Sequence, residues 1–563
     1  MNRAKSGLNA QNLILLVSVI LVLWIIGYPL LNIVKNSFME DGSLDLSAYA
    51  SVFSAQQTYQ ALCNTLLVAA GVLLLAGLIG GSLAFLVEKT DFRYKKTVRF
   101  LVFLEFCIPS YIIAVSWIQI TARGGYYHRF LRLFDPNISY VFSPYSFIAV
   151  IIVLSVHLYP LVFFGVSNAL RKNQGVLENA AKLSGASSFT VFKSVTLPLV
   201  MPSFLSVGLL VFSRATANFG IPALLALPFG GEVLTTRIYK AISELDLQSL
   251  SVLSLLLIAI SYALYAAAEG WVKRRAFYTE TSGAVSARKQ TALGGKRWIA
   301  EFFTGIFFIL VLVIPLITLL LSSFMKRWGL TVSTGNMTLH NYRLVLFENA
   351  MMKRAFLNSL LYGTVSAGAA VCMAVIIVYL HRFARSRTTG FLAAVASLPL
   401  AVPNIILAVG AIFAWINPPF KLYGTCWIIM LTYTVLFIPI CIKQILGLSQ
   451  TVNPSIDLAA RTLGVPIAHR ITQLFMPQVL RGAAAGFLLS FLIAFREIPI
   501  SLLLYSKGNE TAGVLLFTIQ SNSYGLEMTS TIAVIVILIS VAGNLLVQNL
   551  CEKRLVHENA AAY

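Results

Sequence analysis

The stretch Glu178–Pro198, ENAAKLSGASSFTVFKSVTLP, occurs a second time as Asp457–Pro477, DLAARTLGVPIAHRITQLFMP, at an offset of 279 residues and without a gap. Both copies are polar segments that lie between long apolar runs. The shared positions are two adjacent alanines, a glycine and a closing apolar–proline pair: Ala180, Ala181, Gly185, Leu197 and Pro198, and then Ala459, Ala460, Gly464, Met476 and Pro477. Paired small residues let a helix approach another surface closely, and a glycine permits a sharp turn because it has no Cβ. The sequence therefore predicts two short surface helices, each ended by its glycine.

The composition of the whole chain indicates a protein that crosses a membrane several times. Of 563 residues, 58% are hydrophobic and only 11% are charged, whereas soluble proteins carry about 25% charged residues. The net charge of +21 comes from basic residues scattered between apolar runs, so we expect lipid and not nucleic acid as the surroundings. The six cysteines form no CxxC pair, and we expect neither a disulfide framework nor a metal site.

Twelve apolar runs are long enough to span a bilayer, which needs about 20 residues. Helices are expected because a helix satisfies its own backbone hydrogen bonds in lipid. The sequence thus predicts an all-α membrane protein with spans at 12–34, 61–87, 98–121, 147–168, 199–219, 248–269, 299–321, 356–380, 390–416, 425–447, 480–504 and 529–550.

The distribution of lysine and arginine predicts the orientation of these spans. With a cytoplasmic N-terminus, the inside segments hold 25 basic residues and the outside loops hold 13. This bias predicts that both termini are cytoplasmic, and it also places both copies of the repeated stretch in the cytoplasm. Because no small-residue cleavage signal follows the basic start and first apolar run, we expect a retained span and not a signal peptide.

The repetition extends over two six-span halves. Asn64-Thr65 matches Asn358-Ser359 at an offset of 294, and Phe219–Pro222 matches Arg496–Pro499 at 277. The sequence predicts a first repeat at 1–270, a basic cytoplasmic linker at 271–298 and a second repeat at 299–563. Since the repeats run in the same direction, a pseudo-twofold axis along the membrane normal is expected.

The repeated stretch resembles the EAA loop of ABC-importer permeases, with the pattern EAA, three residues, Gly, nine residues, an apolar residue, one more residue, then Leu-Pro. The resemblance implies the type I ABC importer fold and a short coupling helix in each loop that docks on an ATPase subunit, with the alanine pairs facing it. The family's acidic residue would fall at Asn179 and Leu458, but the acids stand one place earlier. The candidate coupling residues are therefore Glu178, Asn179, Ala180, Ala181, Gly185, Asp457, Ala459, Ala460 and Gly464.

The resemblance also implies partners and a location. The chain has no GxxxxGK[ST] phosphate loop, HExxH or GxSxG, so we expect no catalytic residue and no cofactor here, with ATP bound by two copies of a separate ATPase subunit. An extracytoplasmic substrate-binding protein would deliver the solute, and the chain would lie in the bacterial plasma (inner) membrane.

Four charges stand out among those inside the predicted spans, where charge is costly and marks a functional hypothesis. They are Glu105, Arg214, Arg496 and Glu497, the last two at the centre of the predicted span 480–504. One interpretation is a polar patch on the translocation path. The other is a buried ion pair, such as Glu105 with an arginine, that fixes helix packing. The sequence leaves both open.

The expected substrate is ferric iron, because the segments 108–117, 219–225 and 496–503 are most similar to the fused double-length permeases of the ferric-iron group. Relatives that carry thiamine, phosphonate or polyamine are the alternatives. A different class, an ion-gradient-driven secondary transporter of twelve helices, would show a Gly/Asp/Arg motif between spans 2 and 3, and residues 88–97 lack it.

Overall fold

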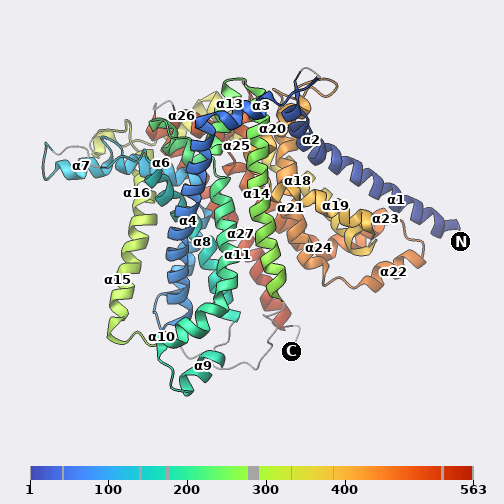
Figure 1. Ribbon diagram of the computed structural model, residues 1–563, viewed down its shortest axis with the longest axis horizontal. Helices are drawn as coiled ribbons and strands as arrows, with labels where there is room; N and C mark the ends of the chain where they lie inside the picture. Colours follow the sequence, from blue (N-terminus) through green and yellow to red (C-terminus); the bar gives the residue numbers. More distant parts are fainter. Residues whose placement is uncertain are drawn as a thin grey trace. The chain divides into compact units, whose positions relative to one another are not determined.

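The computed structural model describes residues 2–40, 43–137, 142–172, 176–276, 291–330, 332–384, 386–521 and 525–560. Over these residues the chain is helical, apart from one small hairpin of β1 (Met39–Glu40) and β2 (Ser43–Leu44) (Figure 1). The all-α class predicted from the sequence is confirmed.

Ten described helices are long and apolar enough to cross a membrane, and two bent helix pairs raise the number to twelve. They follow the order of the twelve predicted spans. The ten long helices are Ala10–Phe38, Gln56–Lys89 (α4), Phe147–Arg171 (within α8), Ser188–Thr216, Leu247–Ala267 (within α14), Gly294–Ser323, Ala350–Phe383 (α18), Cys426–Ser449 (α21), Ile467–Arg496 and Leu526–Gln548 (within α27).

Spans 3 and 9, predicted over 98–121 and 390–416, are each broken into two helices. The first breaks between α5 (Lys95–Cys107) and α6 (Ser110–Thr121) with a bend of 96°, and the second before α20 (Asn404–Trp415) with a bend of 113°. A proline precedes α6 and α20 in each case, and it cannot donate the hydrogen bond that would continue the helix. Hydropathy missed the bends because α6 and α20 are themselves apolar and almost entirely buried.

Spans 5 and 11 begin and end earlier than predicted. Each starts before its proline, passes through a π-helical turn, and continues as α11 (Leu197–Thr216) or α24 (Met476–Arg496). Short buried helices follow, namely α12 (Gly220–Leu225) and α25 (Pro499–Leu504). The prediction that Arg496 and Glu497 lie at the centre of a span is therefore wrong: they lie at the break between α24 and α25.

The chain forms two compact units that do not coincide with the sequence halves. Unit 1 comprises Met1–Ser51, Ala241–Ile258 and Thr338–Tyr563, and unit 2 comprises Val52–Lys240 and Ala259–Met337. The first span of each half thus belongs to the unit that contains most of the other half's helices. Hydropathy carries no information about this exchange.

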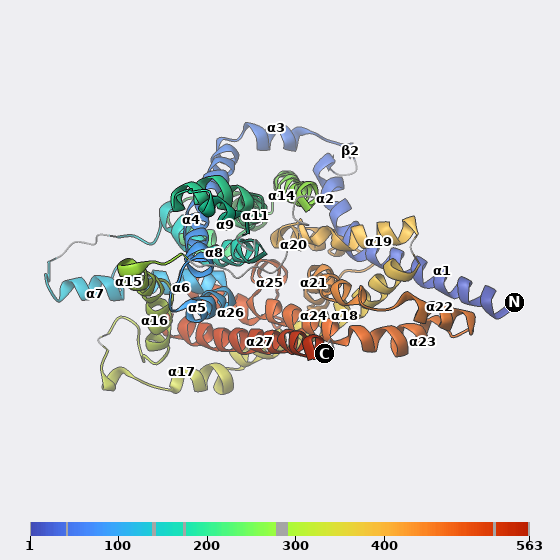
Figure 2. The ribbon, with the colours of Figure 1, turned by 90° about the horizontal axis from the view of Figure 1, so that it is seen from below.

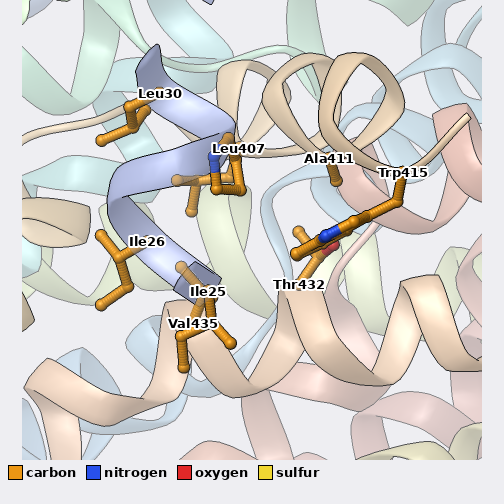
Figure 3. Close-up of a pocket in the computed structure, with 9 residues that line it drawn as sticks. Ile25, Ile26, Leu30, Leu407, Ala411, Trp415, Thr432 and Val435 are labelled. Atoms are coloured by element: carbon orange, nitrogen blue, oxygen red, sulfur yellow. The ribbon is translucent and has the colours of Figure 1, made fainter. Parts of the chain in front are cut away.

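Within unit 1, the first span packs through α2 (Tyr28–Phe38) against α20. A Cβ on Gly410 would lie 3.1 Å from the Pro29 carbonyl oxygen, so glycine permits the close approach. Figure 3 shows Ile25, Ile26 and Leu30 around a small crevice with Leu407, Ala411 and Trp415, and Thr432, the polar residue at its edge, donates to the Ile428 carbonyl at 2.7 Å. This crevice is a small gap in the apolar packing between these helices.

Within unit 2, the seventh span packs through α16 (Ile314–Ser323) against α6. The predicted linker, 271–298, begins as the end of α14 (Leu247–Ala276), and residues 277–290 lie outside the described part of the chain. The described structure resumes at Thr291.

Candidate functional site

The first repeated stretch, here the first coupling loop (residues 178–198), begins in helix α9 (Val176–Leu183). Gly185 has φ +83°, the left-handed region that favours glycine. Its N–H donates to the Lys182 carbonyl and the Ala186 N–H donates to the Ala181 carbonyl, both at 3.0 Å. These two bonds form a Schellman motif, which satisfies the last carbonyls of the helix and turns the chain.

The second coupling loop (residues 457–477) has the same backbone. Helix α22 (Pro454–Thr462) ends at Gly464, with φ +73°. The Gly464 N–H donates to the Arg461 carbonyl and the Val465 N–H donates to the Ala460 carbonyl, again both at 3.0 Å. A Cβ on either glycine would meet no atom within 4 Å, so the backbone conformation, and not space, requires glycine. Both glycines end their helices as the sequence predicts.

The acid of the first coupling loop points into its own unit. The Glu178 carboxylate accepts two hydrogen bonds from Lys89 Nζ, at 2.7 and 2.8 Å, and one from Thr196 Oγ1 at 2.7 Å. Lys89 is the last residue of α4, and Thr196 lies in the π turn that leads into α11. Glu178 therefore connects the coupling helix to the end of span 2 and to the start of span 5.

The acid of the second coupling loop makes the same connection with other partners. Tyr379 OH, near the end of α18, donates to Asp457 at 2.6 Å. Arg461 Nε donates to it at 2.7 Å, and Arg470 at 3.2 and 3.3 Å. Asp457 is 8% exposed and Arg470 is 3% exposed, so this ion pair is buried. The displacement of both acids by one position places each carboxylate toward the bundle.

The outward faces of both coupling helices carry large apolar side chains that sequence reasoning missed. Leu183 is 90% exposed, Leu463 is 81% exposed, and Leu177 and Leu458 are about 60% exposed. The available signal was a leucine one or two residues before each helix-ending glycine. These exposed leucines are available for contact with another protein.

Only one alanine of each pair faces outward. Ala180 and Ala459 are exposed, whereas Ala181 is half-buried and Ala460 is buried. The expectation that both members of each pair face a partner therefore needs correction, because a helix presents adjacent residues about 100° apart. Asn179 is half-buried, and Leu458 at the corresponding position is exposed.

Among the charges in the spans, Glu497 has a clear structural partner. Its carboxylate accepts from the Ile500 N–H at 3.0 Å and from the Ser501 N–H at 3.2 Å, and Asn404 Nδ2 lies 3.4 Å from it. Glu497 therefore accepts hydrogen bonds from N–H groups in the first turn of α25, as a helix-capping side chain does. Asn404 is the first residue of α20, so the carboxylate connects the starts of both short helices.

The first half has an amide at the matching position. Asn218 Oδ1 accepts from the Ile221 N–H at 3.1 Å, with the same three-residue spacing. The matching helices start at 220 and 499, so the structural offset is 279. The offset of 277 taken from the shared Ile-Pro pair is therefore wrong by two residues.

The other charges do not form the hypothesised ion pair. Glu105 is 1% exposed in α5, and within the described residues its carboxylate oxygens have no hydrogen-bond partner. Arg214 has an exposed side chain in the last turn of α11, in the same unit as Glu105, and Arg496 is half-buried at the end of α24. An ion pair between Glu105 and an arginine is not present in the described part of the chain.

The repeated Asn-Thr and Asn-Ser pairs hold matching loops at the opposite ends of the spans. Asn64 Nδ2 donates to the Glu232 carbonyl at 2.9 Å, and Asn358 Nδ2 donates to the Glu510 carbonyl at 2.9 Å. Burial raises the pKa of the Glu510 carboxyl, but hydrogen bonds from the Gly508 N–H and Arg354 outweigh it, so the pKa lies below its ordinary value. The repeat therefore extends to both ends of the fold.

Together, these features define a membrane-spanning transport component built from two repeats, each with one surface loop suited to dock another protein. The sequence pattern of the family described as "Binding-protein-dependent transport system inner membrane component" matches residues 74–276 and 366–555, one match containing each coupling loop. The chain belongs to this family. It is accordingly the permease component of an ABC importer and not an enzyme, and an ion-gradient-driven transporter is excluded.

Two relatives named for ferric transport align with most of the chain, and a sulfate relative aligns with less than half of it. The "Ferric transport system permease protein FbpB" of Actinobacillus pleuropneumoniae is 22% identical over 94% of this chain and 76% of its own length. The "Fe(3+)-transport system permease protein FbpB 2" of Haemophilus influenzae is 23% identical over 89% of this chain and 92% of its own length. The "Sulfate transport system permease protein CysT" of Salmonella typhimurium is 24% identical over 40% of this chain and 80% of its own length.

Proposed function

We propose that this chain forms the translocation path of a ferric-iron ABC importer in the inner membrane of a bacterium. The observation that carries the proposal is the extent of similarity. Two relatives named for ferric transport align with both halves of the chain, whereas the sulfate relative aligns with 40% of it. In this proposal an extracytoplasmic binding protein selects the iron, and this chain provides the passage.

Uptake of radiolabelled ferric iron tests the substrate. Cells that carry the chain, its ATPase and its binding protein should accumulate iron, and cells that lack this chain should not. Competition by excess sulfate, thiamine, phosphonate or polyamine should leave iron uptake unchanged. Uptake of one of these solutes in place of iron would overturn the ferric proposal and leave the permease assignment intact.

In this proposal, each coupling loop docks on one ATPase subunit. The support is the pair of exposed leucines, Leu183 and Leu463, beside the two Schellman turns. Burying such a side chain at an interface contributes about 1.5–3 kcal/mol, and a buried glutamate at the same place would carry an unpaired charge. These leucines, with Ala180 and Ala459, would form the contact, while Glu178 and Asp457 hold the loops in position.

The docking test uses Leu183→Glu and Leu463→Glu. We expect each variant to insert normally and to lose part of the co-purified ATPase. Leu44→Glu is the matched control, because Leu44 is 83% exposed in the β1–β2 hairpin outside both loops. Undiminished ATPase recovery with both loop variants would contradict the docking proposal.

We also propose that both termini are cytoplasmic. Within unit 1, the N-terminal helix α1 (Asn2–Val22) packs beside α22 and α23 (Ile467–His469) of the second coupling loop, which agrees with a cytoplasmic start (Figures 1 and 2). An impermeant thiol reagent applied to intact cells should label a cysteine placed at Thr338 and should spare cysteines in the linker. Labelling of the linker would overturn this orientation.

The role of Glu497 in transport also remains a proposal. Glu497→Gln keeps the shape and one cap acceptor but removes the charge that faces two helix starts. If the carboxylate contributes to the path, the variant should assemble with its ATPase and transport more slowly. Normal assembly with wild-type transport would leave Glu497 as a helix cap alone.

A further inference from the structure

Helix α7 (Tyr126–Arg132) is a feature of the first half without a helical counterpart in the second. It follows α6 directly, whereas in the second half a short connection joins α20 to α21. Figure 1 shows α7 running across the direction of α4 and α15 (Arg297–Phe308), long helices of the same unit, and Figure 2 shows it extending beyond them. A helix in this direction is placed to lie along a membrane surface and not to cross the bilayer.

The polar side of α7 is attached to its own unit. Arg129 Nε donates to the Gly124 carbonyl at 2.7 Å, and its NH1 donates to the Leu330 carbonyl at 2.9 Å. The guanidinium also lies 5.1 Å from the ring centre of Trp328, a cation–π contact. Tyr126 OH lies 2.9 Å from Ser322 Oγ, at the end of α16. These contacts fix which face of α7 points away from the protein.

The outward face is apolar and aromatic. Tyr127, Phe130 and Phe134 follow the i, i+3, i+7 spacing of one helical face, although α7 itself ends at Arg132. They are 42%, 56% and 76% exposed, and the neighbouring Leu133 is 80% exposed. The Phe130 and Phe134 rings lie 5.2 Å apart, so they form one surface. An exposed apolar surface of this kind needs an occupant.

The chemistry of this surface fits phospholipid. Arg123 and Arg132 are exposed, and residues 122–134 contain no acidic side chain, so this segment carries positive charge in addition to its aromatic face. This combination is typical of helices that lie at the headgroup level of a bilayer. The exposed apolar surface of the spanning segment α16, including Ile317, belongs to the same unit, and α16 packs against α6, which leads into α7.

We infer that α7 is a membrane-surface helix, with Phe130, Leu133 and Phe134 buried among the lipids of the outer leaflet. The assignment to the outer leaflet rests on the proposed orientation of the chain, but burial in lipid does not. In this position α7 anchors the outer end of the broken span α5–α6, which has no long helix of its own to hold it in the bilayer. The second half has no such anchor in its described residues.

Photo-crosslinking in nanodiscs tests this inference on the full chain with its ATPase subunits and its binding protein. Benzoylphenylalanine replaces Phe134, which it resembles in shape. Ile317, 49% exposed on α16, is the position expected to face lipid, and Arg132, on the same helix as Phe130 but about 160° around it, is the matched control. After illumination, intact mass spectrometry should show the added mass of one phospholipid at positions 134 and 317 and much less at 132.

Two results would overturn the inference. One is a lipid adduct at 317 without one at 134, because this would place the aromatic face in water. The other is an adduct between position 134 and the binding protein, which would make α7 a protein-docking surface. Neither result depends on transport, so failure here would leave the proposed iron importer untouched, and failure of iron uptake would leave the lipid result standing.

Discussion

The two coupling loops have the same backbone but different supporting side chains. Both helices end in Schellman motifs at Gly185 and Gly464, with matching hydrogen bonds of 3.0 Å. The first loop is held by one lysine and one hydroxyl on Glu178, and the second by a tyrosine and two arginines on Asp457. The turn requires a particular backbone conformation, which few residues adopt, whereas several side-chain pairs can hold a helix against a bundle. The loops should therefore respond alike to backbone changes and differently to charge changes.

The largest expected effect on coupling to the ATPase comes from the backbone. Gly185→Val and Gly464→Val place a β-branched residue in the left-handed region, and even an ordinary residue costs about 1–2 kcal/mol there. We expect both variants to insert but to lose the ATPase, or to keep it without substrate-stimulated hydrolysis. Gly→Asn at each position is the matched control, since asparagine tolerates this conformation. Gly185→Asp and Gly464→Asp add a charge at the contact and should again uncouple. Full coupling in all of the valine and aspartate variants would contradict the assignment of these loops as the ATPase-coupling loops.

Removal of the loop charges should lower the free energy of unfolding by different amounts in the two loops. Asp457→Asn leaves Arg470 buried and unpaired, which costs about 3–5 kcal/mol. Glu178→Gln leaves Lys89 with an amide acceptor at a more exposed site, and we expect about 1–3 kcal/mol. The free energy of unfolding in mixed micelles measures both losses. Equal losses would contradict the difference between the loops.

A smaller effect is expected from the tyrosine of the second loop. Tyr379→Phe removes one hydrogen bond to Asp457 and keeps the ring, which packs 5.5 Å from Phe475. A hydrogen bond to a charged group contributes about 1.5–3 kcal/mol, and the two arginines still hold the carboxylate. The variant should lose less unfolding free energy than Asp457→Asn. A loss as large as that of Asp457→Asn would show that the hydroxyl, and not the ion pair, holds the loop.

The smallest effect concerns the end of the linker, which contacts the first half's segment next to Lys89. The Leu293 N–H donates to Asp91 at 2.8 Å and the Arg297 guanidinium donates to the same carboxylate, so the pKa of Asp91 lies below its ordinary value. A lowered pKa in the folded protein means that the contribution is present above the unfolded pKa, about 3.9, and is lost as the pH falls through the folded value. Asp91→Asn should therefore speed proteolysis of the linker at neutral pH, and acidification should reproduce this in the wild type. A linker cut equally fast with and without Asp91 at neutral pH would contradict the attachment.

The sequence predicted those parts of the fold that depend on local pattern. The gapless repeat around Gly185 and Gly464 predicted both helix ends, because a glycine in this position is a local conformational requirement. The apolar runs predicted the order of the spans. Hydropathy does not show the breaks after α5 and before α20, because buried broken helices are as apolar as straight ones, and Pro109 and Pro403 are the local signals for them.

The parts that depend on distant contacts could not be predicted. Lys89 and Tyr379 lie 89 and 78 residues from the acids they hold, and nothing in their local sequence indicates those partners. The exchange of first spans between the two units is likewise a packing choice without a hydropathy signal. Glu497 was recognised as unusual, but its role as a cap for α25 depends on the break between helices α24 and α25. The apolar residues around this break give no signal of it in the sequence.

The most direct test of the two-loop account is the number of ATPase subunits held by one chain. Native mass spectrometry of the nucleotide-free complex should show two ATPase subunits per wild-type chain, one after Leu183→Glu or Leu463→Glu, and none after both substitutions. The Leu44→Glu control should keep two. Retention of two subunits by the double variant would contradict the claim that these loops dock the ATPase.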